Sequence, residues 1–256
     1  MACGAFLEGK AAAAAAAPGI PWENRGSLGL WTAGWETLKQ VLLAPTEAYG
    51  KMRLPASLGD AMIFFVIFGG GGAVVGALWG AVLQNLMQHW MMSLMTLFLP
   101  QAATMSSAPS PFSPQAMLLL QGGVGMIMAP FGAVLGMMIC GLLGHLGLLM
   151  TGAPRKDLGT TLAVYAYAMG AAGIFHLLPL GWLIAMLWAP VCYIAGLIRV
   201  HGCKTWQGVV AALWWHFLLL CCCGGVAIVA ALCLPPMMAS FPTPPAPIAA
   251  PLPAGG

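Results

Sequence analysis

The sequence predicts an all-α fold, a polytopic transmembrane bundle of five helices. It also predicts an amphipathic cytoplasmic segment before the bundle and extra helical segments on the outer face between spans 1 and 2. Of 256 residues, 61% are hydrophobic and only 6% are charged, whereas soluble domains carry about 25% charged residues. Three long stretches have no charge at all, residues 61–154, 158–198 and 205–256. Because about 20 helical residues cross a hydrocarbon core of about 30 Å, these stretches can hold several spans. The composition excludes an ordinary soluble domain and a nucleic-acid-binding protein.

The part of the chain before the first span divides in two. Residues 1–21 include seven consecutive alanines and lack the basic start of a signal peptide, so we expect a flexible tail. Residues 22–60 are rich in charge, and Pro45 ends or restarts a helix there. Spacings of 4, 3 and 4 place four apolar residues of this segment on one helical face: Trp31, Trp35, Leu38 and Leu42. That face is expected either at the membrane interface or packed on the protein's own helices.

The membrane domain is expected at residues 61–234. Its spans are predicted at about 61–83, 131–150, 160–177, 180–198 and 208–232. The nine basic residues then lie before span one, between spans two and three, and between spans four and five, all on one side. The positive-inside rule therefore places the N-terminus in the cytoplasm and the C-terminus outside. Tyr165 and Tyr167 point to different sides of span three, so we expect one to be packed and one to face lipid.

Two further segments lie between spans one and two. Residues 84–99 and 115–129 are compatible with helix and flank a loop rich in Ser and Pro, and Pro130 predicts a kink. These helices either protrude as a hairpin or lie along the membrane surface. Residues 235–256 contain eight prolines and predict an unfolded tail.

Small residues recur at four-residue spacing in the first two spans. Such stripes let helix backbones approach closely in lipid. The predicted helix-packing or oligomer-interface residues are Gly72, Gly76, Gly80, Gly132, Gly136 and Gly144. We expect these stripes either to pack helices within one chain or to form the interface of a homo-oligomer.

A few polar residues are candidates for function. Arg199, His201 and Lys204 form a basic cluster typical of lipid headgroup contacts. His145 and His216 lie within predicted spans, where a histidine makes either a helix–helix hydrogen bond or a gating or proton-handling site.

Signatures of catalysis are missing from the sequence. No Asp or Glu falls in a predicted span, no HExxH or GxSxG motif occurs, and no GK[ST] follows the glycine run at residues 69–72. The eight cysteines lack metal-ligand spacing. We therefore expect no catalytic residues, no metal, no cofactor and no enzymatic activity.

Three stretches carry a family resemblance. They are WETLKQVLLAPTEAYGKMRLPASLGDA, HLGLLMTGAPRKDLGTTLAVYAYA and HLLPLGWLIAMLWAPVCYIAGLIRVHG. Together with the five-span layout, they resemble the Yip1 domain family in its bacterial form, over roughly residues 35–234. The resemblance implies an integral protein of the bacterial inner membrane. Eukaryotic members are associated with Rab GTPases, vesicle formation and membrane shaping. Their Asp-Leu-Tyr-Gly-Pro motif is missing here, because Leu58, Gly59 and Asp60 do not match it, so a Rab-type partner is not carried over.

These observations favour a non-enzymatic membrane protein that organises the bilayer or membrane-protein partners. The alternative is a small oligomeric channel or transporter, based on the uncharged Gly- and Met-rich spans, Pro130, Pro190 and the two intramembrane histidines. A lipid-modifying enzyme is the least supported, since no acid, nucleophile and base come together. The expected partners are the lipid bilayer, a second copy of the chain or other membrane proteins, and no nucleic acid.

Overall fold

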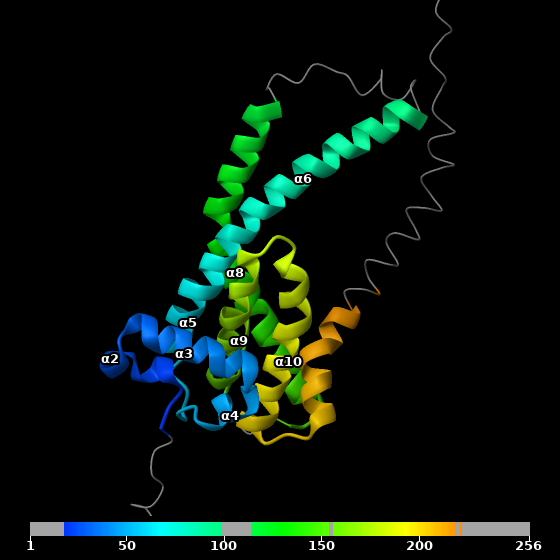
Figure 1. Ribbon diagram of the computed structural model, residues 1–256. Helices are drawn as coiled ribbons and strands as arrows, with labels where there is room; N and C mark the ends of the chain where they lie inside the picture. Colours follow the sequence, from blue (N-terminus) through cyan, green and yellow to red (C-terminus); the bar gives the residue numbers. More distant parts are fainter. Residues whose placement is uncertain (1–17, 99–113, 154–155, 219–220, 222–256) are drawn as a thin grey trace, which may run out of the picture. The chain divides into compact units, whose positions relative to one another are not determined.

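The computed structural model describes residues 18–98, 114–153, 156–218 and 221, and within these ranges it is helical without strands. The chain divides into two compact units, residues 1–213 and 214–256, and the fold described below is that of the first. Figure 1 shows its helices. They are η1 (Pro21–Asn24), α2 (Arg25–Leu28), α3 (Leu30–Leu43), α4 (Pro45–Gly50), α5 (Leu58–Phe64), η2 (Phe65–Gly70), α6 (Gly71–Phe98), α8 (Pro114–Met150), α9 (Leu158–Ala172), η3 (Gly173–Leu177) and α10 (Gly181–His201).

Four helical stretches are long and apolar enough to cross a membrane. They are Leu58–Phe98, Gly122–Met150, Leu158–Leu177 and Gly181–His201. They agree with the first four predicted spans and indicate a membrane protein. Most of the predicted fifth span, 208–232, lies outside the described residues, and its described part, 208–218, is helical.

The segments predicted as helical between spans one and two are helical at residues 84–98 and 115–129, and each is continuous with its span. Helix continues without interruption from Leu58 to Phe98 through α5, the π-helix η2 and α6, and α8 continues through Pro130 to Met150. Residues 84–98 are mostly Leu, Met and Gln, which favour helix, so nothing stops α6 earlier. A proline inside a helix removes one backbone hydrogen bond, and here the helix tolerates it. The predicted outer segments are extensions of the spans themselves.

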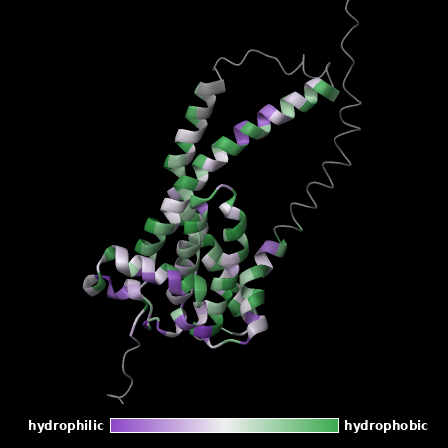
Figure 2. Ribbon diagram, in the orientation of Figure 1, coloured by the Kyte–Doolittle hydropathy of each residue, from purple (hydrophilic) through white to green (hydrophobic). Residues whose placement is uncertain are grey.

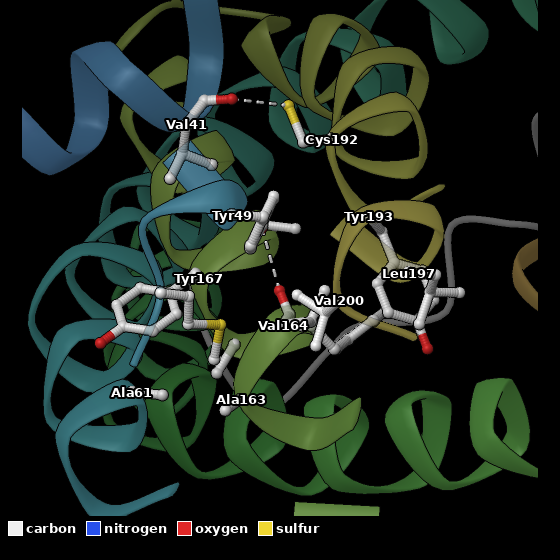
Figure 3. Packing of buried hydrophobic residues seen from close by; sticks show 14 of the residues in the cluster. Val41, Tyr49, Ala61, Ala163, Val164, Tyr167, Cys192, Tyr193, Leu197 and Val200 are labelled. Atoms are coloured by element: carbon white, nitrogen blue, oxygen red, sulfur yellow. Dashed lines mark hydrogen bonds between the residues drawn. The ribbon is translucent and has the colours of Figure 1, made fainter. Parts of the chain in front are cut away.

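Helix α9 is the centre of the unit. It contacts α3, α5, η2, α8 and α10, and nearly all of its side chains are buried. Tyr165 and Tyr167 are both buried, so the prediction that one of them faces lipid is wrong. Tyr165 packs edge-on against Tyr193 with ring centroids 4.7 Å apart, and Tyr167 lies 5.3 Å from Phe64. Figure 3 shows Tyr167 and Tyr193 among the buried side chains around α9. Because α9 is covered by its neighbours on all sides, neither tyrosine faces lipid.

Residues 18–21 of the predicted N-terminal tail are part of the folded unit, and residues 1–17 lie outside the described residues. Ile20 is fully buried, and the Gly19 amide donates a hydrogen bond to the Lys51 carbonyl at 2.9 Å. The chain is anchored here because a buried apolar side chain and a paired backbone amide both favour the folded position.

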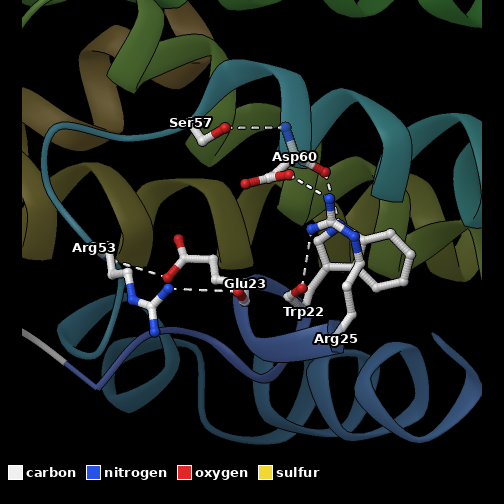
Figure 4. Close-up of polar contacts among 6 residues, drawn as sticks. All are labelled: Trp22, Glu23, Arg25, Arg53, Ser57 and Asp60. Atoms are coloured by element: carbon white, nitrogen blue, oxygen red, sulfur yellow. Dashed lines mark hydrogen bonds and ion pairs between the residues drawn. The ribbon is translucent and has the colours of Figure 1, made fainter. Parts of the chain in front are cut away.

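Trp22 explains why this anchor forms. Its indole Nε1 donates to the Asp60 carbonyl and its backbone N–H donates to Thr37 Oγ1, both at 2.8 Å. Its ring packs edge-on against Phe64. Arg25 lies over the same ring at 5.3 Å and pairs with the Asp60 carboxylate at 2.5 Å (Figure 4). The segment before α3 is therefore fastened to the start of the first long helix.

Candidate functional site

Helix α3 is amphipathic, but the face that it buries is not the predicted stripe. Its inward face consists mainly of small residues and is buried: Ala33, Gly34, Thr37, Leu38 and Val41. Trp31 and Trp35 point outward, with 74% and 53% of their surfaces exposed. Of the predicted stripe, Leu38 packs on the protein and the two tryptophans do not. The packing alternative therefore holds for Leu38, whereas Trp31 and Trp35 stay exposed among the residues that the structure describes.

Three contacts fix α3 against the helices behind it. Gly34 lies directly on the Phe68 ring, where a Cβ atom would collide with it. The C-terminal carbonyls of α3 accept hydrogen bonds from α10, Leu42 from Trp188 Nε1 at 3.0 Å and Val41 from the Cys192 thiol at 3.3 Å. The outward tryptophans are thus mounted on a rigid support.

Charged residues accompany α3. Lys39 Nζ lies 2.6 Å from Glu36 Oε1 on the helix surface, and both side chains are about two-fifths exposed. Figure 2 shows hydrophilic residues around α2, α3 and α4, while α8 and α10 are mainly hydrophobic. An exposed ion pair beside exposed tryptophans is typical of a helix at the membrane–water interface.

Glu23 joins the loop before η1 to the loop after α4. Its Oε2 accepts a hydrogen bond from the Ile20 backbone N–H at 3.0 Å. It also accepts one from the Arg53 backbone N–H at 3.1 Å (Figure 4). Burial raises the pKa of the Glu23 carboxyl, because desolvation disfavours the charged form more than these hydrogen bonds favour it. Glu23 fastens two loops, and sequence periodicity gave no signal for it.

A second polar cluster lies among α8, α9 and α10. Thr161 Oγ1 lies 2.8 Å from His145 Nδ1 and 3.1 Å from His201 Nε2, and the two imidazole rings are 6.5 Å apart. For His145, this contact is a helix–helix hydrogen bond, one of the two roles that the sequence predicts for it. Thr161 was not a predicted site residue, since a lone threonine in an apolar helix carries no distinctive signal.

His201 does not occupy the predicted headgroup position. Only 1% of its surface is exposed, because α10 turns it toward α9, and its Nδ1 has no hydrogen-bond partner within the described ranges. Near it, the Thr160 hydroxyl donates to the Asp157 carboxylate at the start of α9. That hydrogen bond is the main cause of the lowered pKa of Asp157. The site is an interior polar chain rather than a surface cluster.

The other two residues of the predicted headgroup cluster are exposed. Arg199 lies against α4, and its Nε would be 2.9 Å from a Cβ atom on Gly50. Lys204 begins the turn after α10, and its backbone N–H donates to Gln207 Oε1 at 2.9 Å. Gln207 Nε2 in turn donates to the Thr151 carbonyl at 2.9 Å, joining this turn to the one before α9.

The six predicted glycines fall into two groups. Three face other elements of the same unit. Gly72 faces the backbone of Gly173, Gly76 faces the His176 ring, and Gly144 faces the Tyr193 hydroxyl. A Cβ atom at any of the other three would meet nothing within 4 Å among the described residues: Gly80, Gly132 and Gly136. The first group packs the chain on itself, and the second remains available to lipid or a partner.

His216 lies in the second unit, where its ring centroid is 3.5 Å from that of Trp215. Among the described residues, no group of three or more His, Cys, Asp or Glu side chains could hold a metal ion.

Comparison with known proteins adds no relative. No protein-family model, curated protein or solved structure matches the chain at a significant level.

Proposed function

We propose that this chain is a non-enzymatic integral membrane protein that shapes and organises the bilayer in which it sits. The role is the one implied by the resemblance to the Yip1 domain family, with the N-terminus in the cytoplasm of a bacterial cell and the bundle in its inner membrane. The single observation that supports it best is α3, which presents Trp31 and Trp35 outward from a fixed support.

The physical argument starts from side-chain preference. Tryptophan favours the headgroup level because its ring is apolar and its N–H is polar. A helix that inserts such residues into one leaflet expands that leaflet relative to the other. Since α3 is hydrogen-bonded to α10 through Leu42 and Val41, it cannot retract without breaking those contacts. The bundle would therefore keep one leaflet expanded relative to the other for as long as it is folded.

The test is vesicle shape after reconstitution. We expect the wild-type protein to reduce the mean liposome diameter seen by electron cryomicroscopy at a fixed protein-to-lipid ratio. The double variant W31A/W35A should restore the diameter of protein-free liposomes. Trp90→Ala is the matched control, because Trp90 is also well exposed but lies on α6. Equal diameters for wild type and W31A/W35A would contradict the proposal.

The partners that we propose are a second copy of the chain or another membrane protein. The open glycine face of α8, at Gly132 and Gly136, supports close helix approach in lipid. Disulfide cross-linking of Gly136→Cys in membranes should yield a dimer if a second copy covers this face. Recovery of monomer alone would exclude the second copy.

A small oligomeric channel or transporter is the second candidate. The chain of polar atoms His145–Thr161–His201 favours it, since such chains can carry protons within helical bundles. Liposome flux measured with an entrapped pH-sensitive dye separates the two candidates. Reproducible flux that is lost on changing His145 or His216 would replace the first proposal with the second.

A further inference from the structure

A groove of about 510 Å³ lies between α4 and the C-terminal half of α10. It is open on one side. The lining residues are Thr46, Val191, Ile194, Ala195, Ile198, Arg199 and Gly202. Helix α10 supplies most of the lining, and Thr46 of α4 lies on the other side.

The wall along α10 is apolar. Val191, Ile194 and Ile198 recur at spacings of three and four, which places them on one helical face. From Val191 to Ile198 the helix rises about 10 Å at 1.5 Å per residue. This surface suits a hydrocarbon chain lying parallel to α10.

The end of the groove is cationic. Arg199 is exposed there and, in the part of the chain that the structure describes, makes neither an ion pair nor a hydrogen bond. Gly50 has no side chain, so the guanidinium fits against α4 beside the groove. Thr46 adds a hydroxyl at the rim. A planar guanidinium with free N–H groups is the side chain best suited to bind a phosphate.

We propose that this groove binds one anionic phospholipid. Its phosphate pairs with Arg199 and the Thr46 hydroxyl, and an acyl chain follows Val191, Ile194 and Ile198. Charge complementarity selects the occupant, because an unpaired cation at the end of an apolar groove matches an amphiphile with a negative head. A zwitterionic lipid carries its own ammonium and gains less at this site. The proposal rests on membrane insertion and not on membrane shaping by α3.

The experiment uses the full-length protein in detergent, titrated with dioleoylphosphatidylglycerol or dioleoylphosphatidylcholine and followed by native mass spectrometry. We expect the first phosphatidylglycerol to bind at least fivefold more tightly than phosphatidylcholine. Arg199→Gln should abolish this preference. The matched control is Lys204→Gln, which removes a nearby exposed cation outside the groove and should preserve the preference. Ala195→Trp fills the groove and should weaken the first binding of both lipids.

The outcomes separate a discrete site from general attraction. An equal loss of preference in Arg199→Gln and Lys204→Gln would show diffuse electrostatics and overturn the proposal. Displacement of the lipid by glycerol phosphate at comparable concentration would show that the acyl wall contributes nothing, and would also overturn it. Thermal unfolding of each variant checks the fold, and Ala195→Trp and Arg199→Gln perturb the groove at different ends. Vesicle diameter with W31A/W35A is an independent readout, so failure of either proposal leaves the other standing.

Discussion

Replacing Gly72 by alanine tests the helix packing at its tightest point. A Cβ atom there would lie 2.9 Å from the Gly173 carbonyl carbon and closer still to its oxygen. These are backbone atoms, so no side chain can rotate away and α6 must separate from η3. Overpacking of this kind costs about 1–3 kcal/mol. The gain in helix propensity on replacing glycine offsets up to about 1 kcal/mol. We therefore expect a net destabilisation of about 1–2 kcal/mol, measured by reversible unfolding in mixed detergent–SDS micelles.

Gly80→Ala is the matched control for this measurement. Gly80 lies on the same helix two turns further on, is exposed, and a Cβ atom there would meet nothing within 4 Å in the described ranges. We expect this variant to be as stable as wild type or more stable by up to about 1 kcal/mol, since alanine favours helix. Equal stability of the two variants would refute the contact between Gly72 and Gly173. Destabilisation of Gly80→Ala alone would instead locate the close packing between chains.

Substitutions at three other positions probe the polar contacts, each followed by thermal unfolding in detergent. Trp22→Phe keeps an aromatic ring but leaves the carbonyl at the start of the first long helix without its indole donor, so we expect a loss of about 1–3 kcal/mol; an unchanged melting temperature would contradict this role. Thr161→Val removes the hydroxyl between His145 and His201 and should cost a similar amount, whereas Thr161→Ser should retain wild-type stability; equal losses in both would point to packing rather than hydrogen bonding. Because the folded-state pKa of Glu23 is raised, the folded protein holds this proton more tightly, and stability should decline as pH rises from the ordinary pKa of 4.5 through the raised folded-state pKa. Glu23→Gln should flatten that decline, and identical pH profiles would show that Glu23 does not cause it.

The membrane class was predictable because the charges are so unevenly placed. Long uncharged stretches leave a chain no route to a soluble fold, and four of the predicted spans coincide with apolar helices in the structure. Helix ends were less predictable. Nothing in the residues after position 83 marks a stop, so α6 runs on to Phe98, well beyond the predicted end of span one.

The position of each helix in the bundle was not predictable. Helix α9 is the most buried of the four apolar helices, and although its mean hydropathy of 1.4 is lower than the 1.9 to 2.2 of the other three, it is still high enough for a membrane span. In a membrane protein, lipid and protein interior are both apolar, so hydropathy cannot separate a helix that faces lipid from one covered by its neighbours. This is why Tyr165 and Tyr167 were wrongly divided between the two environments, and why His201 was expected at the surface.

The charged N-terminal segment contains both buried and exposed tryptophans, and the difference between them bears on function. Trp22 is buried because Asp60 and Thr37 satisfy its polar groups and Phe64 covers its ring. Within the described part of the chain Trp31 has no such partners, since the inward face of α3 is made mainly of small residues that fit closely against the helices behind it. Small residues inside allow tight docking, and this docking leaves the large aromatic residues outside. In water, that arrangement would expose apolar surface at a free-energy cost, whereas at a bilayer surface it gains the burial of the same rings. The geometry of α3 therefore favours a lipid surface as the partner that completes it.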